Sequence, residues 1–284
     1  MARDGPVRRY AYATLLATKE YLPGVIALSR SLRNSGTRYP LEILVAEPLM
    51  DKETVSLLDL EGARVTLASP LALSTEFVER HHTAALHRQD PFLNGEKPSF
   101  HSPVENFLKL RVWELEEYER VAFIDADAIV LQNPDEIFEF EPFAGAPNEY
   151  LRDDPERRLN SGVFVAEPDR SSFERLLECL DSPDAYWRRT DQSFLQMMFP
   201  NWDRLPSRFN TLQYLWLNRP ELWNWDEIVV LHYQYEKPWD RNHAKTGALA
   251  PLIELWHHVA RTGCTPASFP PPPGFGSTPL QMSG

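Results

Sequence analysis

The stretch VAFIDADAIV, residues 121–130, decides the fold of this chain. Residues 121–124 are apolar without polar alternation, which is typical of a strand covered on both faces in a parallel sheet. Asp125 and Asp127 follow at once, separated by Ala126, so the strand delivers two negative charges to one place. Such a pair is costly without a partner, and a hard divalent cation with oxygen ligands is the usual one. Because ligands bind at the carboxyl ends of strands in open α/β sheets, we predict a cation site here; the alternative is a capping turn.

The chain before this stretch alternates strands and helices. Apolar runs predict strands at 10–16, 41–46 and 64–67, and helical spacing predicts helices at 22–32 and 52–60. This β-α-β-α-β order begins a doubly wound, mostly parallel sheet. Neither a G-x-G-x-x-G after the first strand nor a G-x-x-x-x-G-K-[ST] motif occurs, so both common phosphate-binding loops are excluded.

Composition and charge exclude several classes of protein. The 284 residues carry a net charge of −12 without a dense basic cluster, which argues against a nucleic-acid partner. Cys179 and Cys264 are the only cysteines, which excludes a disulfide framework and fits a reducing compartment. The first nine residues are polar, and the chain lacks the run of about eighteen apolar residues that a membrane span needs. We therefore expect a cytoplasmic protein without a membrane span.

The C-terminal end differs from the rest of the chain. Residues 263–284 include four consecutive prolines at 270–273 and have little to bury. We expect this Pro-rich segment to be an extended or disordered tail, outside a single domain that spans residues 8–262.

The middle of the chain holds an irregular segment followed by a helix. Periodicity fades from residue 69 to residue 102, and we expect a binding loop there rather than a site built from its four histidines, which lack metal-ligand spacing: His81, His82, His87 and His101. Periodicity returns at 104–115, which we expect to pack beneath the aspartate pair. Lys109 and Arg111 lie within this helix, where either both reach solvent or one faces an anionic ligand.

Polar residues recur at the ends of predicted elements in the second half. Strands are predicted at 143–146, 163–166 and 228–231, and helices at 136–140, 172–180, 190–199 and 249–259. A small Asn-Ser-Gly turn at 160–162 precedes one strand, and Asp191 with Gln192 opens a helix, where capping is the alternative role for Asp191. His232 ends the last strand, and Lys237 follows five residues later.

The order of these motifs resembles the glycosyltransferases of family 8, the glycogenin and galactinol synthase group. The resemblance runs from about Tyr10 to about Trp256 and leaves out the Pro-rich segment. Residues 107–113 with Tyr118, the Asn-Arg-Pro-Glu stretch at 218–221 and the ending at 232–239 look closer to galactinol synthases than to glycogenins.

The resemblance implies an α/β, Rossmann-like GT-A fold in a single domain. It also implies a UDP-glucose or UDP-galactose donor, a small polyol or saccharide acceptor and a bound Mn²⁺ ion, with Mg²⁺ as the alternative; a homodimer stays open. Asp125, Asp127 and His232 would ligate the metal, and two carboxylates with an imidazole suit Mn²⁺.

The resemblance also assigns roles to single residues. Lys109 would approach the donor sugar, Asp191 and Gln192 would lie nearest the anomeric carbon, and the ring of Tyr21 would stack on the uracil base. Lys237 would neutralise the diphosphate as a point charge on a flexible stem. Donor binding as a whole is assigned to Leu16, Thr18, Tyr21, Asp125, Ala126, Asp127, Asn160, Ser161, Gly162 and Lys237.

One loop departs from the family pattern. Residues 233–236, between His232 and Lys237, contain no glycine and are one residue fewer than in glycogenin, so the backbone there cannot approach the diphosphate in the same way. No tyrosine aligns with the self-glucosylated tyrosine of glycogenin, since Tyr214 is out of register. Self-priming is therefore not expected.

The family retains anomeric configuration, and two mechanisms could achieve this. A covalent glycosyl intermediate needs a spare carboxylate pair, whereas the metal occupies the obvious one, so we expect a front-face mechanism instead. Two other functions stay open: a non-catalytic sugar-nucleotide or glycan-binding protein of the same fold, and a haloacid dehalogenase-type phosphohydrolase, which also places D-x-D after an apolar strand.

Overall fold

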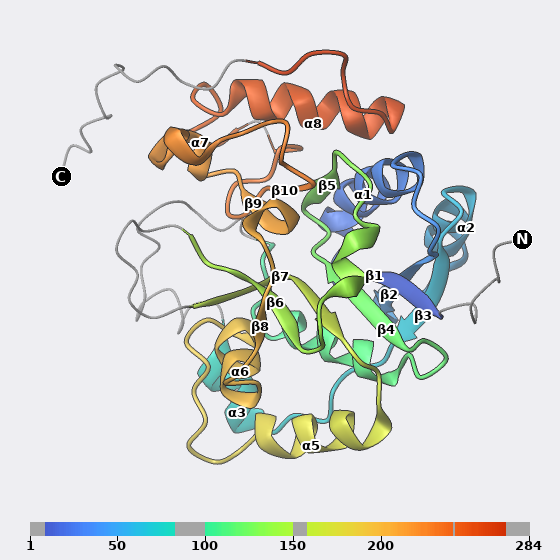
Figure 1. Ribbon diagram of the computed structural model, residues 1–284. Helices are drawn as coiled ribbons and strands as arrows, with labels where there is room; N and C mark the ends of the chain where they lie inside the picture. The colour runs from blue at the N-terminus through green and yellow to red at the C-terminus, as the bar shows by residue number, and fades with distance from the viewer. Residues whose placement is uncertain (1–8, 83–99, 150–157, 241, 271–284) are drawn as a thin grey trace, which may run out of the picture.

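The computed structural model describes residues 9–82, 100–149, 158–240 and 242–270. The strands of its central sheet are β1 (Tyr10–Leu16), β2 (Leu41–Ala46), β3 (Arg64–Ala68), β4 (Arg120–Ile124), β6 (Ala144–Pro147), β7 (Leu159–Ala166) and β8 (Asp203–Arg204). They form a seven-stranded sheet in the order β3-β2-β1-β4-β7-β6-β8 (Figure 1). Strands β3, β2, β1 and β4 run parallel, whereas β7 is antiparallel to both of its neighbours. This confirms the predicted α/β class with a mostly parallel sheet.

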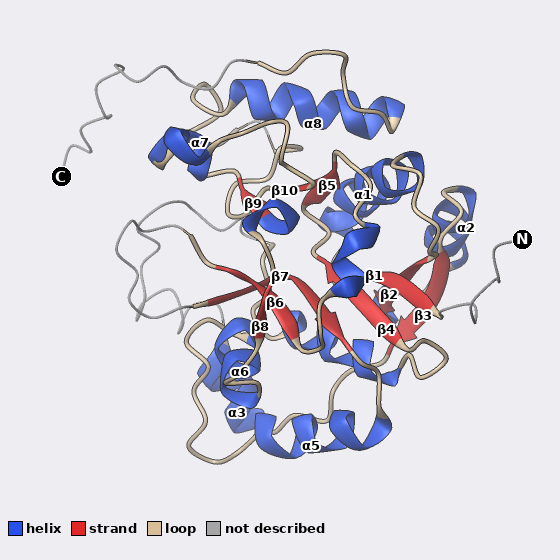
Figure 2. Cartoon of the chain, in the orientation of Figure 1, coloured by secondary structure: helices blue, strands red, loops and turns tan. Residues whose placement is uncertain are grey.

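A second, three-stranded sheet lies beside the first. It consists of β5 (Ala128–Val130), β9 (Thr211–Leu212) and β10 (Val230–His232) in the order β5-β10-β9. Its side chains pack with the helices α7 (Leu215–Asn218) and α8 (Ala250–Thr262) in a core of their own. In Figure 2 this small sheet lies between the main sheet and α8.

Helices cover both faces of the main sheet (Figure 2). They are α1 (Leu22–Asn34), α2 (Lys52–Leu60), α3 (Thr75–His81), α5 (Arg170–Leu180), α6 (Asp191–Met198) and the 3₁₀ segments η1 (Lys19–Tyr21), η2 (Glu47–Leu49), η3 (Glu105–Glu114), η4 (Asp135–Glu139), η5 (Ser207–Asn210) and η6 (Pro220–Leu222). Ala122 and Ile124 of β4 pack with α1, α2 and η4, and Val121 and Phe123 pack with η3, α3, α5 and α6. Strand β4 is thus buried on both faces, as its unbroken apolar run predicts.

Most predicted elements are present, but two predictions are wrong. The segment from residue 69, predicted to be irregular, contains the helix α3 (Thr75–His81), which Ser74 caps and which buries Phe77. Asn160, Ser161 and Gly162 do not form a turn, because β7 begins at Leu159 and includes all three. Asn, Ser and Gly are depleted in strands, so propensity hides this start. The predicted helix at 104–115 is present as the 3₁₀ helix η3.

The structure describes His81, one of the four histidines of the segment at 69–102, in full. His81 is buried, with its Nδ1 2.9 Å from the carbonyl of Phe77 and its Nε2 accepting the N–H of Trp187 at 2.9 Å. Both ring nitrogens are therefore used inside the protein, which favours a structural role. His87 lies outside the described residues.

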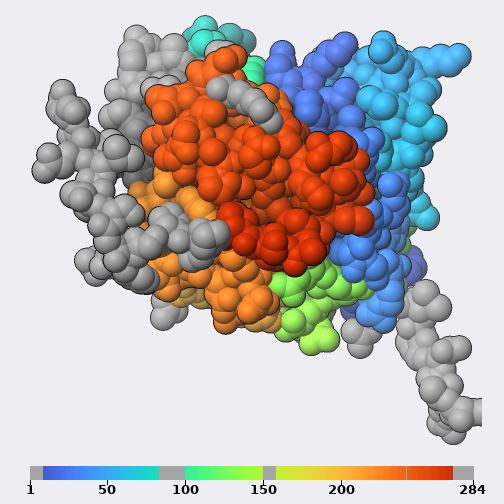
Figure 3. Space-filling view, turned by 90° about the horizontal axis from the view of Figure 1, so that it is seen from above, coloured from blue at the N-terminus to red at the C-terminus, as the bar shows by residue number. Residues whose placement is uncertain are grey.

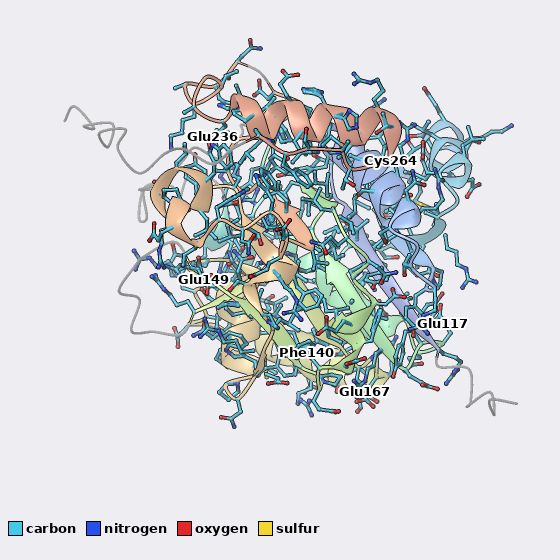
Figure 4. The ribbon with its side chains drawn as sticks, turned by 45° about the horizontal axis from the view of Figure 1, so that its top comes forward. Glu117, Phe140, Glu149, Glu167, Glu236 and Cys264 are labelled. Carbon is cyan, nitrogen blue, oxygen red and sulfur yellow. The ribbon has the colours of Figure 1, made fainter. Side chains whose placement is uncertain are left out.

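The first part of the Pro-rich segment packs against the domain. Phe269 stacks on Trp225 with ring centroids 4.5 Å apart, and Trp225 Nε1 donates to the carbonyl of Pro270 at 2.7 Å. Cys264, labelled in Figure 4, lies just after α8, with its sulfur 3.6 Å from Asn34 Nδ2 at the end of α1. Figure 3 shows this part of the chain lying across α8, beside the N-terminal elements drawn in blue. Residues 271–284 lie outside the described residues.

None of the described helices reaches the length and hydropathy that a bilayer-spanning helix needs.

The aspartate stretch presses directly against α1. Gly24, in the first turn of α1, leaves no room for a side chain, since a Cβ atom there would lie 2.2 Å from the carbonyl oxygen of Ala126 and 2.8 Å from a ring carbon of Trp239. A glycine at this position therefore allows the backbone between Asp125 and Asp127 to approach the helix.

We predict that Gly24→Ala lowers the free energy of unfolding by about 1–3 kcal/mol, because the added methyl group must displace a backbone carbonyl. Thermal unfolding followed by circular dichroism measures this change. Gly247→Ala is the matched control, because a Cβ at Gly247 meets nothing within 4 Å. Equal unfolding midpoints for the two variants would contradict the packing argument.

Candidate active site

The two sheets meet at the aspartate pair. Residues 125–127 connect β4 of the main sheet to β5 of the small sheet, and the N–H of Asp125 donates to the carbonyl of Gly162 in β7 at 2.8 Å. The carbonyl of Asp127 accepts the N–H of Tyr233, which follows β10, at 2.8 Å. Backbone bonds to both sheets thus fix the position of the pair.

Strand pairing brings His232 to the carboxylates. In the antiparallel register of β5 and β10, His232 lies opposite Ala128, the residue after Asp127. Its Nε2 is 3.1 Å from Asp127 Oδ1 and 4.0 Å from Asp125 Oδ2. One ligand atom from each of the three side chains lies within 4.8 Å of the others, and His232 and Asp127 are buried.

A chain of hydrogen bonds assigns the protons on His232. The N–H of Gly162 donates to Asn160 Oδ1 at 2.9 Å, so that oxygen is an acceptor, and Asn210 Nδ2 donates to it at 3.0 Å. Asn210 Oδ1 consequently faces His232 Nδ1 at 2.8 Å, and the imidazole must donate there. In the neutral ring, this leaves the lone pair on Nε2, which faces the carboxylates.

The donor set fits a divalent cation. A lone pair on His232 Nε2 and a carboxylate oxygen 3.1 Å apart repel each other unless a proton or a metal ion lies between them. Two carboxylates and one imidazole suit Mn²⁺. Asp125, Asp127 and His232 are therefore the residues that would hold the metal.

Gly162 makes room for the imidazole. A Cβ atom at this position would lie 2.4 Å from Cε1 and 2.6 Å from Nδ1 of His232. The sequence suggests that this glycine allows the backbone to approach a ligand, and in the structure the group that approaches it is His232.

Lys237 compensates the charge of Asp127. Its Nζ donates to Asp127 Oδ2 and, at 3.0 Å, to the carbonyl of Tyr233, and its side chain is fully buried. Burial raises the pKa of Asp127, but the positive charge of Lys237 and its hydrogen bond hold that pKa well below its ordinary value. Asp127 therefore stays ionised although it is buried.

The loop that carries Lys237 adopts a glycine-like backbone without a glycine. Tyr235 has a φ of 66°, a conformation that costs an ordinary side chain about 1–2 kcal/mol. Gln213 fixes this loop, because its Nε2 donates to the carbonyls of Gln234 and Glu236, the latter at 3.1 Å. Tyr235 therefore takes a left-handed backbone conformation in a loop that contains no glycine.

Lys109 joins two carboxylates on the other side of the site. Its Nζ is 3.0 Å from Asp125 Oδ1 and 2.9 Å from Asp191 Oδ2. Burial acts to lower the pKa of Lys109, but the charges of Asp125 and Asp191 more than offset it, so that pKa is raised and the amine stays charged. Arg111, by contrast, bonds to Glu114 and to the carbonyls of Ser69 and Pro70.

Three donors hold the carboxylate of Asp191. Besides Lys109, Ser161 Oγ donates to its Oδ2 and Thr190 Oγ1 donates to its Oδ1 at 2.8 Å. Asp191 is the first residue of α6 rather than its cap, and Thr190 before it has a φ of 50°, in the region that favours glycine. Such strain, about 1–3 kcal/mol, is concentrated at functional sites.

A hollow of polar character surrounds these groups. Its lining includes Asp125, Asp127, His232, Lys109, Tyr21 and Gln192. Gln192 Oε1 and Gln234 Nε2 are buried atoms that lack a hydrogen-bond partner among the described residues, and both residues line the hollow. Unpaired buried polar atoms are costly, so these two amides suit a polar ligand.

Comparison with known proteins identifies the family. The sequence model described as "Glycosyl transferase family 8" matches residues 13–243 of the chain. The chain belongs to glycosyltransferase family 8.

The proteins to which this chain is similar carry the names of different enzymes. Putative UDP-glucuronate:xylan alpha-glucuronosyltransferase 3 of Arabidopsis thaliana is 30% identical over 244 residues, which cover 82% of this chain and 35% of that protein. Glycogenin of Neurospora crassa is 27% identical, covering 86% and 33%, and galactinol synthase 1 of Solanum lycopersicum is 27% identical, covering 88% and 81%. The chain thus spans about a third of the length of the xylan glucuronosyltransferase.

Solved structures agree on the fold. The glycosyltransferase GlyE of Streptococcus pneumoniae TIGR4 has a TM-score of 0.62 at 14% identity, covering 89% of this chain and 60% of GlyE. The galactosyltransferase LgtC, in complex with donor and acceptor sugar analogs, has a TM-score of 0.54 at 14% identity, covering 89% and 95%. The Rossmann-like GT-A fold predicted from the sequence is confirmed.

The predicted site residues of this family 8 chain divide into two groups. Most of them surround the hollow or contact residues that line it. Leu16 is instead buried in the core, and neither it nor Thr18 lines the hollow, whereas their neighbours Leu15 and Ala17 do. The role of Leu16 and Thr18 in holding uridine stays a prediction. Tyr21 lines the hollow, and its ring makes edge contacts with Phe100 and Trp239.

Sequence reasoning missed Asn210, Ser161 as a partner of Asp191, and Lys109 as the link between two carboxylates. Asn210 follows no recognisable motif, because its importance comes from the pairing of β9 with β10, which places it beside His232. Strands of two or three residues leave too short a pattern to predict.

We predict that Asn210→Ala weakens Mn²⁺ binding by about 10–100-fold, because it removes the acceptor that orients His232. Isothermal titration with MnCl₂ measures this, with thermal unfolding as a check on the fold. Asn218→Ala, at an exposed residue of α7, is the matched control. Unchanged Mn²⁺ affinity in a folded Asn210→Ala protein would refute this role of Asn210.

Proposed function

We propose that this chain is a retaining glycosyltransferase that moves a hexose, glucose or galactose, from a UDP-sugar to an acceptor hydroxyl and depends on Mn²⁺. The observation that carries the proposal is the cluster of Asp125, Asp127 and His232 beside two buried lysines, in a chain of family 8. A bound cation would supply positive charge for the diphosphate of the donor.

Two lysines support the departure of the diphosphate. Lys237 is buried with its amine beside Asp127, and its positive charge suits the developing negative charge of a leaving diphosphate. Lys109 is held between Asp125 and Asp191, on the side of the site where Ser161 and Gln192 lie. We expect the amine of Lys109 to approach the donor sugar, and Tyr21, which lines the hollow near Lys237, to contact the base.

The contacts of Asp191 favour a front-face reaction. Both of its carboxylate oxygens accept hydrogen bonds, and one of them is also paired with Lys109. A carboxylate engaged in this way is a poor nucleophile, so Asp191 acts by holding Lys109 and Ser161. In the proposed step the acceptor oxygen bonds to the anomeric carbon, the bond from that carbon to the diphosphate oxygen breaks, and the diphosphate takes the acceptor proton.

We predict that Asp125→Asn and Asp127→Asn each abolish Mn²⁺-dependent release of UDP from UDP-sugars, since each loses a metal ligand. Asp125→Asn is the cleaner variant, because Lys109 keeps Asp191 as a partner, whereas Asp127→Asn leaves Lys237 buried without its carboxylate. Asp226→Asn, at an exposed position, is the control. Wild-type rates in a folded Asp125→Asn protein would remove the metal role.

The donor panel contains UDP-glucose, UDP-galactose and UDP-glucuronate, and the acceptor screen includes myo-inositol and short glucans. UDP-glucuronate is included because similar xylan enzymes carry it in their names. Release of phosphate from simple monoesters would indicate a phosphohydrolase instead, and donor binding without turnover on any acceptor would indicate a binding protein.

We also predict that no sugar becomes covalently attached to Asp191 during turnover. Mass spectrometry of the enzyme, quenched with acid during turnover of each UDP-sugar, tests this prediction. It is applied to the wild type and to Ser161→Ala, which removes the hydroxyl that donates a hydrogen bond to Asp191 Oδ2. A hexose mass on the peptide that contains Asp191 would overturn the front-face mechanism.

A further inference from the structure

A second hollow of about 410 Å³ adjoins the active-site hollow, and Gln192 lines both. We call it the arginine groove, because Arg158, Arg188 and Arg189 line it together with Gln192 and other residues of one face of α6. The position of Gln192 matters here, because the residue before it, Asp191, is paired with Lys109 in the active-site hollow. A ligand in the arginine groove would therefore lie next to the reaction centre.

The described lining of the arginine groove holds three positively charged side chains in a protein of negative net charge. The chain as a whole carries a net charge of −12, yet none of the described residues that line the groove is an aspartate or a glutamate. Guanidinium groups form paired, charge-assisted hydrogen bonds with carboxylates and phosphates. An arginine that already has one partner still presents further N–H donors, so the groove suits an anion in either case.

The walls of the groove are held by hydrogen bonds rather than left to loop movement. Gln196 Oε1 accepts the N–H of Leu159 at 3.0 Å, which ties α6 to β7. Ser193 Oγ accepts the N–H of Arg189 at 3.0 Å, and the carbonyl of Arg158 accepts the N–H of Asn148 at 2.7 Å. The backbones of Arg158 and Arg189 are therefore fixed, which lowers the cost of ordering their side chains around a ligand.

The size of the groove fits a sugar rather than a lone anionic group. Its volume is within the range of about 300–1,000 Å³ that small-molecule sites occupy. Met197 is 46% exposed beside it and offers an apolar surface to the C–H face of a sugar ring. A carboxylate of the donor sugar alone would need far less space.

We infer that the arginine groove binds the acceptor, and that this acceptor is a saccharide with an anionic group, a uronate carboxylate or a phosphate ester. This inference rests on the proposed function, because the groove adjoins the donor site only if the active-site hollow binds the donor. It narrows the acceptor from polyols and saccharides in general to anionic saccharides.

Binding experiments test the inference separately from catalysis. Isothermal titration in the presence of UDP and MnCl₂ compares methyl β-D-glucuronide, glucose 6-phosphate and neutral methyl β-D-glucoside. We expect an anionic sugar to bind about tenfold more tightly than the glucoside, and the Arg188→Gln/Arg189→Gln variant to lose that difference. The preference should also weaken as NaCl is raised, since Arg188 is exposed. The two anionic sugars distinguish a carboxylate from a phosphate.

Arg170→Gln is the matched control, because Arg170 pairs with Glu174 of α5 and Glu114 of η3 and does not line the groove. Equal affinity of the wild type for all three sugars overturns the inference. The same holds if the Arg188→Gln/Arg189→Gln variant loses affinity for the neutral and the anionic sugars to the same extent. If the Arg188→Gln/Arg189→Gln variant lost activity with UDP-glucuronate as donor but not with the other donors, the arginines would bind the carboxylate of the donor. That result would also overturn the inference. Failure of UDP release with every donor, by contrast, would count against the proposed function, while the binding comparison would still decide the role of the groove.

Discussion

The site depends on the pairing of three carboxylates, two of them buried and one partly exposed, with two buried lysines. Asp127 is paired with Lys237, and Asp125 and Asp191 share Lys109. An isolated ionised carboxylate in such a place would cost several kcal/mol, and it would take up a proton instead. Because Lys237 lies beside Asp127, the pKa of Asp127 is held well below its ordinary value, and this buried acid keeps its charge. Three carboxylates against two ammonium groups still leave one negative charge in excess, which is the electrostatic condition for holding a cation near His232.

This pairing explains why elements far apart in the chain must fold together. Lys109 comes from η3, Asp191 from the start of α6, and His232 and Lys237 from the end of β10 and the loop after it. Each of these side chains pairs with a side chain from a different element. Replacing one of them therefore leaves a buried polar or charged group of another element without its partner. The two strained residues, Thr190 and Tyr235, lie next to Asp191 and in the loop before Lys237. Backbone strain is thus located where the chain must aim a charged side chain into the site.

The sequence predicts the fold better than it predicts the contacts of the site. Long apolar runs and helical spacing identify β1, β2, β4 and α1 because burial on a regular element repeats along the chain. The strands of the small sheet are two or three residues long, and their pairing, which places Asn210 beside His232, leaves no such repeat. The sequence predicts a turn at Asn160, Ser161 and Gly162 because small hydrogen-bonding residues precede an apolar run. In the structure they belong to β7, where Asn160 and Gly162 support the imidazole and Ser161 supports Asp191.

Helix α6 connects the paired carboxylates and lysines of the active-site hollow with the arginine groove, which we assign to the acceptor. Its first residue, Asp191, is buried and bound by three donors, whereas Gln192, Ser193 and Gln196 line the arginine groove. Substitutions at the buried end disturb a coupled network of charges, and their effects are not additive. Substitutions at exposed positions usually cost little stability. The acceptor surface is therefore free to vary while the donor chemistry is constrained, so similarity to xylan glucuronosyltransferases, glycogenin and galactinol synthase is compatible with an acceptor that differs from each of theirs.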